Sequence, residues 1–242
     1  MKTVLVIPAR YKSTRLPGKP LIDIEGKSML QRVYEQCLKA FPPDLIYVAT
    51  DDQKIIEHCN LNQMNVVLTS TDCLTGTDRI AEFSKIIDAD YFINVQGDEP
   101  LIDPEDILKI KNEIANNQGK ILNGYCAITT EENFKSVGIP KVVFREDKRL
   151  LYMSRSGIPG NKNSKFNLGF RQVCVYAFPK NALNDFSKIK SKTLFEKEED
   201  IEILRFLEIG YEVQMIELSN SSIPVDYPED VIKVVKQLNK ND

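Results

Sequence analysis

An uninterrupted apolar run, residues 4–7, leads directly into a strongly basic loop. A run without polar residues predicts a strand buried on both faces, as in a parallel sheet. The loop holds four cations and no carboxylate, namely Arg10, Lys12, Arg15 and Lys19. Guanidinium forks and a point-charge ammonium at the end of a buried strand predict a polyphosphate site, although the loop matches neither Gly-x-x-x-x-Gly-Lys-Ser/Thr nor Gly-x-Gly-x-x-Gly. Taken alone, the cluster also fits an exposed basic loop.

The first half of the chain alternates predicted strands and helices. Strands are predicted at residues 4–7, 45–49, 65–69 and 91–95, and helices at residues 29–38, 52–59, 80–87 and from 104. This rhythm predicts an α/β fold with a mostly parallel sheet and helices on both faces. Ligands of such sheets bind beyond the carboxyl ends of the strands. The basic loop, residues 50–52 and residues 96–98 are therefore expected to share one crevice.

The pattern changes after about residue 122. Strands with long polar connections are predicted at residues 122–129, 141–144, 150–154 and 172–178. A helix over 201–207 stops at Gly210, a strand follows over 212–216, and Pro228 opens a final helix. We expect one continuous domain over residues 1–242, in which residues 122–185 form a smaller, more antiparallel lobe between residues 1–121 and a return to the main sheet over 186–242.

Charge and residue usage exclude several classes of protein. The net charge of −3 argues against a general affinity for nucleic acid. No apolar run approaches the length of a membrane span, and a strand is predicted so near the amino end that no signal peptide is expected. The five cysteines are scattered without a Cys-x-x-Cys, as in a cytoplasmic protein with reduced thiols.

The single histidine, His58, excludes a histidine-rich zinc site. It lies near the carboxyl end of a polar helix, where a structural or solvated role is expected. Asp98 is the best catalytic candidate, because it follows a buried strand and a glycine in Asn-Val-Gln-Gly-Asp-Glu-Pro. Carboxylate oxygens in that position suit Mg²⁺, and a turn or a helix cap is the alternative.

Residues 7–21 closely resemble the signature of sugar nucleotidyltransferases that activate 3-deoxy-2-keto sugar acids with CTP, the 3-deoxy-manno-octulosonate cytidylyltransferase family. The resemblance is strong over residues 1–105 and traceable to about residue 235. It implies a Rossmann-like nucleotidyltransferase sheet, a CTP-binding first half, and a middle lobe for sugar binding and dimerisation. Residues 75–79, Thr-Gly-Thr-Asp-Arg, resemble the family segment near cytosine and ribose; alternatively they start a helix capped by Thr77. The implied CTP contacts are Pro8, Ala9, Arg10, Ser13, Arg15, Lys19, Thr75, Gly76 and Arg79.

The resemblance also implies a metal and a sugar site. It assigns Mg²⁺ to Asp98 and to Asp226 of Val-Asp-Tyr-Pro-Glu-Asp, although Asp226 before a proline could equally be a helix cap. The implied sugar contacts are Gln96, Arg155, Arg171, Gln172, Tyr176 and Glu202. Two of the positions depart from the family pattern, because Gln172 replaces a histidine and Ile203 replaces a glutamine.

These implications predict a magnesium-dependent enzyme that joins CTP and 3-deoxy-manno-octulosonate, with release of pyrophosphate. Catalysis would rest on Arg10, Arg15, Lys19 and Asp98, and no general base is assigned. A cytoplasmic homodimer that supplies lipopolysaccharide or capsule sugar is the family expectation, with neither nucleic acid nor membrane as partner. The alternatives are a related 2-keto-3-deoxy acid, such as an amino-substituted octulosonate or a nonulosonate, and a non-catalytic nucleotide-binding regulator.

Overall fold

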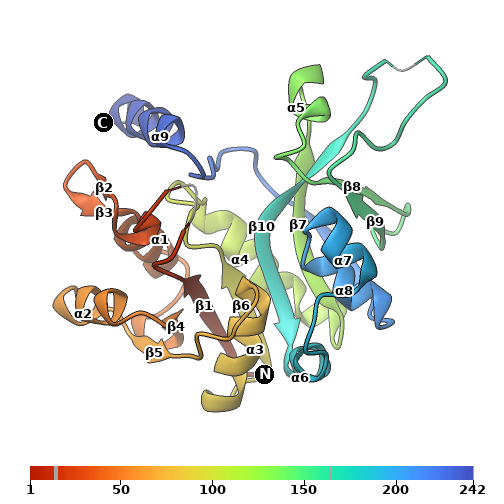
Figure 1. The fold of residues 1–242 in the computed structure, drawn as a ribbon. Coiled ribbons are helices and arrows are strands. Elements are labelled where there is room, and N and C mark those ends of the chain that lie inside the picture. Colours follow the sequence, from red (N-terminus) through yellow and green to blue (C-terminus); the bar gives the residue numbers. More distant parts are fainter. Residues whose placement is uncertain (14–15, 164, 242) are drawn as a thin grey trace.

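The structure, a computed structural model, describes residues 1–13, 16–163 and 165–241. A mostly parallel sheet runs through its centre (Figure 1). From one edge inward, its parallel strands are β5 (Val66–Leu68), β4 (Ile46–Thr50), β1 (Thr3–Ala9) and β6 (Tyr91–Val95). These strands are short apolar runs, and β6 is buried along its whole length. The predicted α/β fold is confirmed.

The sheet continues beyond β6 with one reversed strand. The strand β10 (Phe170–Pro179) is antiparallel both to β6 and to β7 (Ile121–Ala127). At the far edge, β11 (Val213–Glu217) runs parallel to β7. The chain from residue 121 onward therefore contributes strands to the main sheet itself. Only β8 (Lys141–Phe144) and β9 (Leu150–Ser154) form an antiparallel extension, which is attached through β10.

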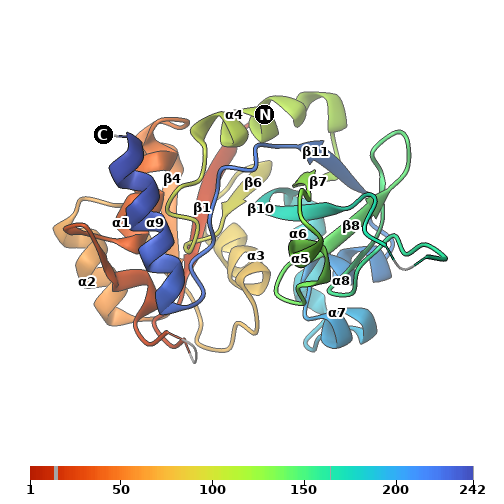
Figure 2. The ribbon, with the colours of Figure 1, turned by 90° about the horizontal axis from the view of Figure 1, so that it is seen from above.

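Helices cover both faces of the sheet, and each face has its own apolar core. One core packs α1 (Met29–Leu38), α2 (Gln53–Leu61) and α4 (Pro104–Glu113) against the sheet. The other core packs α3 (Gly76–Ile86), α6 (Lys180–Lys188) and α8 (Ile203–Glu208) against the opposite face. Figure 2 shows α3 and α4 on opposite sides of β1 and β6. Alternate residues of β1 explain this division, because Leu5 enters the first core and Val4 the second.

A third, smaller core lies above the carboxyl ends of the parallel strands. There α9 (Pro228–Asn241) packs on the hairpin of β2 (Asp23–Ile24) and β3 (Lys27–Ser28), with Ile24, Met29, Val225 and Val234 buried between them. The carboxyl end of the chain thus folds back beside this hairpin (Figure 1). Among the described residues, none of the helices is long and apolar enough to cross a membrane.

Two short helices complete the second half, α5 (Glu131–Lys135) after β7 and α7 (Leu194–Glu199) after α6. They lie on the side of the sheet that carries β8 and β9 (Figure 1). In α7, Thr193 and Glu196 form a reciprocal capping box, so the helix begins at a defined residue. The residue that follows its last turn, Asp200, has a left-handed backbone with φ of 51°.

Candidate active site

Two adjoining cavities open at the carboxyl ends of β1 and β6. The first has a volume of about 400 Å³ and the second of about 310 Å³. Five residues line both of them, which are Gln96, Asp98, Asp200, Glu202 and Asp226. The shared residues place the two cavities on either side of Asp98 and Asp226. A substrate in one cavity would therefore meet a substrate in the other at these two carboxylates.

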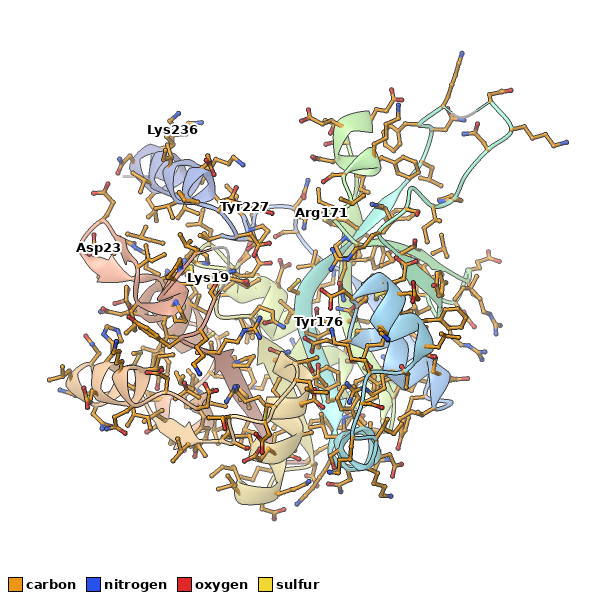
Figure 3. All side chains as sticks on the ribbon, in the orientation of Figure 1. Lys19, Asp23, Arg171, Tyr176, Tyr227 and Lys236 are labelled. Carbon is orange, nitrogen blue, oxygen red and sulfur yellow. The ribbon has the colours of Figure 1, made fainter. Side chains whose placement is uncertain are left out.

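The first cavity collects residues that are far apart in the sequence. Its lining includes the predicted nucleotide contacts Pro8, Ala9, Arg10, Ser13, Lys19, Thr75, Gly76 and Arg79. Arg15 lies outside the described residues. The second cavity is lined by all of the predicted sugar contacts, namely Gln96, Arg155, Arg171, Gln172, Tyr176 and Glu202. Figure 3 shows Lys19 on one side and Arg171 with Tyr176 on the other, where β10 passes.

Lys19 is the cation at the meeting point of the two cavities. Gly18, with a left-handed φ of 68°, turns the chain into the short helix η1 (Lys19–Leu21) and so presents the lysine. Its Nζ donates to Oδ2 of Asp98 at 2.7 Å and to Oδ1 of Asp226 at 3.0 Å. Burial by itself lowers the pKa of Lys19, but the charges of the two carboxylates outweigh it and leave the pKa above its ordinary value. Lys19 is therefore held charged.

The two carboxylates are brought together by backbone contacts. The N–H of Val225 donates to the carbonyl oxygen of Asp98 at 2.9 Å, which fixes the carboxyl-terminal segment against the end of β6. Gly97 permits a second close approach, because a Cβ there would lie 3.1 Å from the carbonyl oxygen of Pro8. A side chain at this position would require the ends of β1 and β6 to shift by a few tenths of an ångström. The glycine therefore lets the basic loop and Asp98 face the same cavity.

The amino end of α3 forms another wall. Thr75 caps this helix, with its Oγ1 accepting a hydrogen bond from the N–H of Asp78 at 3.2 Å, so the cap is Thr75 and not Thr77. Glu202 accepts hydrogen bonds from the N–H groups of Gly76 at 3.2 Å and Thr77 at 2.8 Å. Burial raises the pKa of Glu202, although these donors work in the opposite direction. Glu202 thus joins α3 to α8 as well as lining both cavities.

Arg79 is buried behind this wall, with 3% of its surface exposed. Its guanidinium donates to Oγ1 of Thr69 at 2.5 Å and lies 3.3 Å from a carboxylate oxygen of Asp51. Residues 50–52 themselves line neither cavity, contrary to the expected shared crevice. Asp51 is turned toward Arg79, and Asp52 caps α2 through the N–H of Lys54. The end of β4 therefore lies outside both cavities and contacts the site only through the pair of Asp51 with Arg79.

The two arginines of the second cavity already have protein partners. Arg155 donates to the backbone oxygens of Glu199 at 2.5 Å, Val137 at 3.0 Å and Asp200 at 2.9 Å. Arg171 donates through two nitrogens to Oδ1 of Asn220, at 3.1 and 2.7 Å. Arg155 therefore ties the segment after α5 and the carboxyl end of α7 to the end of β9. Arg171 also donates to the backbone oxygen of Gln172 at 3.4 Å, so both of its acceptors are neutral and its positive charge is left for an anion.

Several residues of the site were assigned no role from the sequence. Lys192 and Asp200 line the first cavity and form an ion pair at 2.5 Å. Glu99 is buried beside Asp98, and burial, followed by the charge of Asp98, raises its pKa to about 7. Cys174 lines the second cavity, where burial raises the pKa of its thiol.

Arg205 of α8 connects the helices that surround the site. Its guanidinium binds both carboxylate oxygens of Glu196 at 2.6 Å, reaches Asp78 at 3.0 Å and stacks 3.7 Å above the ring of Phe186. Arg205 and Glu196 are both fully buried. The bidentate pair satisfies both charges, so α7, α8 and the start of α3 are held as one unit.

His58 has the structural role expected for it. His58 shares a hydrogen bond of 2.7 Å between its Nε2 and Oγ of Ser28, the cap of α1, and burial lowers its pKa. All five cysteines are free thiols. Within the described residues, no group of three or more His, Cys, Asp and Glu side chains could hold a metal ion. A cation at this site would depend on the pair of carboxylates that Lys19 joins.

Known proteins resemble the chain over nearly its whole length. A family model described as Cytidylyltransferase matches residues 4–218. A 3-deoxy-manno-octulosonate cytidylyltransferase of Protochlamydia amoebophila is 40% identical over 97% of this chain and 93% of its own. An 8-amino-3,8-dideoxy-manno-octulosonate cytidylyltransferase of Shewanella frigidimarina is 39% identical over 96% of this chain and 97% of its own. The solved structure of a CMP:2-keto-3-deoxy-manno-octonic acid synthetase complexed with CTP superposes with a TM-score of 0.92 at 34% identity, covering all of both chains.

Proposed function

Because the chain belongs to the cytidylyltransferase family, we propose that it joins CTP and 3-deoxy-manno-octulosonate to give the CMP-sugar and pyrophosphate. One observation carries the proposal: the two cavities meet at Asp98 and Asp226. The first cavity has the cations and the helix start that suit a nucleoside triphosphate. The second has arginines and hydrogen-bonding side chains that suit a sugar acid.

The reaction needs two substrates in line at the junction. The anomeric hydroxyl of the sugar would attack the α-phosphorus, forming a new P–O bond as the bond to pyrophosphate breaks and the hydroxyl proton passes to water. Transfers of this kind depend mainly on positioning and on neutralising charge. Arg10 and Lys19 supply cations on the triphosphate side, and we assign Arg15 to the same role from the sequence alone. Asp98 and Asp226 face both substrates.

The pair of carboxylates fits a magnesium ion. Their oxygens already converge on one cation, the Lys19 ammonium, and Mg²⁺ typically binds one or two carboxylates together with phosphate oxygens and water. Asp98 and Asp226 would hold the ion, and Lys19 would then be free to turn toward the phosphates. The metal would neutralise charge on the α-phosphate and lower the pKa of the attacking hydroxyl.

The sugar side of the site supports an acid substrate. Arg171 reaches the second cavity with only Asn220 as its side-chain acceptor among the described residues, so it is our candidate for the substrate carboxylate. The amino-substituted octulosonate is the second candidate substrate. It is favoured by the Shewanella relative and by Gln172 and Ile203, which replace the residues expected from the family pattern.

We also propose that the enzyme works as a cytoplasmic homodimer that supplies lipopolysaccharide or capsule sugar. Large apolar side chains are exposed around the antiparallel extension, including Leu151 at 56%, Leu168 at 55% and Phe195 at 47%. Such a group supports an interface on this side of the molecule.

The proposal is tested by pyrophosphate release from CTP and Mg²⁺ with a panel of sugar acids. The panel contains 3-deoxy-manno-octulosonate, its 8-amino analogue and a nonulosonate, and UTP replaces CTP as the control. We expect rapid release with CTP and 3-deoxy-manno-octulosonate. Release with the amino sugar alone would favour the second candidate. Binding of CTP without release for any acid would contradict an enzymatic role.

A further inference from the structure

Strand β10 is irregular where it borders the second cavity. Val173 lies opposite Gly124 of β7, but Tyr176 lies opposite Asn123, so β10 has extra residues between two successive partners. A bulge of this kind interrupts the ladder of backbone hydrogen bonds. The side chain of Asn123 repairs it, because its Nδ2 donates to the carbonyl oxygens of both Val173 and Val175 at 3.1 Å.

These two hydrogen bonds fix the orientation of the Asn123 amide. Asn123 is fully buried, and both hydrogens of its Nδ2 are used. Carbonyl oxygens can only accept, so the amide cannot turn over without placing oxygen against oxygen. Its Oδ1 is therefore an acceptor in a fixed position. The Nε2 of Gln172 donates to it at 3.1 Å.

The hydrogen bond to Asn123 fixes the orientation of the Gln172 amide. Because its Nε2 faces Asn123, its Oε1 must point elsewhere, and the residue lines the second cavity. In the described part of the chain, no side chain or backbone group donates to this oxygen. Among the described residues, the only fully buried side-chain polar atoms without a hydrogen-bond partner are those of the Asn94 amide. Oε1 of Gln172 is not among them, so it is accessible from the cavity.

We infer that Gln172 presents a fixed hydrogen-bond acceptor to the second cavity, and that it selects sugar acids with a donor at the facing position. Asn123 is the positioning residue, because its hydrogen bonds to the bulge of β10 keep Nε2 of Gln172 turned toward Asn123 and Oε1 turned away from it. A free glutamine could turn over and serve a donor or an acceptor equally. A held glutamine favours a hydroxyl or an amine and disfavours a group that can only accept. The inference rests on the proposed function, since it assigns specificity within the proposed sugar site.

The experiment uses sugar analogues in which one hydroxyl at a time is replaced. An amino group keeps the donor and loses the acceptor, whereas fluorine loses the donor. At one position, we expect the wild-type enzyme to use the amino analogue within a few-fold of the parent sugar and the fluoro analogue about 10- to 100-fold less well in kcat/KM. Gln172→Met should remove this difference at that position, with KM for CTP unchanged. Gln118→Met is the matched control, because Gln118 is exposed beyond the opposite end of the sheet.

Two further variants separate positioning from folding. Gln172→Glu keeps an acceptor toward the cavity and should still reject the fluoro analogue, with lower rates for all sugars because its second oxygen faces Oδ1 of Asn123. Asn123→Leu should bring the amino-to-fluoro ratio toward one, whereas a purely structural role would lower all rates alike and leave the ratio unchanged. If Asn123→Leu does not fold, the Gln172 variants decide the matter.

The inference is overturned if Gln172→Met keeps the wild-type ratio at every position, or if the wild-type enzyme prefers fluorine to the amino group throughout. Absence of turnover with the parent sugar and with every analogue would instead contradict the proposed function. The two failures are therefore distinguishable.

Discussion

Replacing Lys19 by methionine should strengthen the binding of magnesium to the nucleotide-free protein while weakening the use of CTP. Lys19 lies between Asp98 and Asp226 and forms an ion pair with each. A metal ion that binds these carboxylates in the wild-type protein must first displace the ammonium. Methionine keeps much of the side-chain volume but removes the competing charge.

The distances set the size of the effect. With Nζ at 2.7 and 3.0 Å from the two carboxylates, their oxygens are less than about 6 Å apart, and an effective dielectric of 20 gives a repulsion of about 3 kcal/mol without the lysine. The carboxylates are 31% and 34% exposed, so solvent screens part of this repulsion. We expect roughly 1–2 kcal/mol in favour of the divalent ion, or about tenfold tighter binding.

The assay is calorimetric titration of Mg²⁺ into both proteins without nucleotide, followed by steady-state kinetics with CTP. The loss of a charge-assisted contact to phosphate should lower kcat/KM for CTP by about 10- to 100-fold. Lys180→Met is the control, because Lys180 pairs with Asp88 alone at an exposed site and should change neither quantity. A folded Lys19→Met protein whose Mg²⁺ affinity is unchanged or weaker would refute the view that Lys19 occupies the metal position.

Three other changes test separate parts of the site. Asp98→Asn should abolish most turnover without changing the thermal midpoint of the metal-free protein by more than a few degrees, and survival of Mg²⁺-dependent turnover would remove Asp98 from the metal site. The stability of the metal-free wild-type protein should fall by about 3 kcal/mol as the pH rises from about 4.5 to 7, because Glu99 has a folded pKa of about 7, above its ordinary 4.5, and binds its proton more tightly when folded. In Glu99→Gln, urea unfolding across this range should lose the Glu99 contribution to the slope, whereas the contribution of Glu202, whose pKa is also raised by burial, should remain. Arg205→Met should lower the free energy of unfolding by about 3–5 kcal/mol, because the Glu196 carboxylate stays buried without its partner, whereas the half-exposed Arg145 tolerates the same change.

Local pattern was sufficient to predict much of the fold. The helix over residues 29–38 and the strand over residues 91–95 have the predicted bounds, because apolar spacing and flanking turn residues agree there. The helices α6 and α7 escaped prediction even though signals were present. Ala182, Leu183 and Phe186 have helical spacing in α6, and Thr193 with Glu196 forms the capping box of α7. Short helices contain too few apolar positions for periodicity to stand out.

From local spacing alone, the candidate site could be predicted only where residues lie at the ends of recognisable strands, whereas Asp226 and the sugar contacts came from the family resemblance. Lys19 and Asp98 were found in this way. Their contact was not, because Lys19 is 79 residues from Asp98 and 207 from Asp226 in the sequence. The bulge of β10 and its repair by Asn123 were equally hidden, since no turn residue or break in the apolar pattern marks them. Such contacts depend on how distant strands pair, which local spacing does not specify.

The central claim is that one site transfers a cytidylyl group from CTP to a sugar acid. Its most direct test follows CTP labelled separately at the α- and γ-phosphorus during incubation with Mg²⁺ and 3-deoxy-manno-octulosonate. We predict that the α-label appears in a CMP-sugar in one-to-one yield with pyrophosphate that carries the γ-label. If the α-label appears only in free CMP or CDP, or if labelled CTP persists unchanged beside the sugar acid, the account is contradicted.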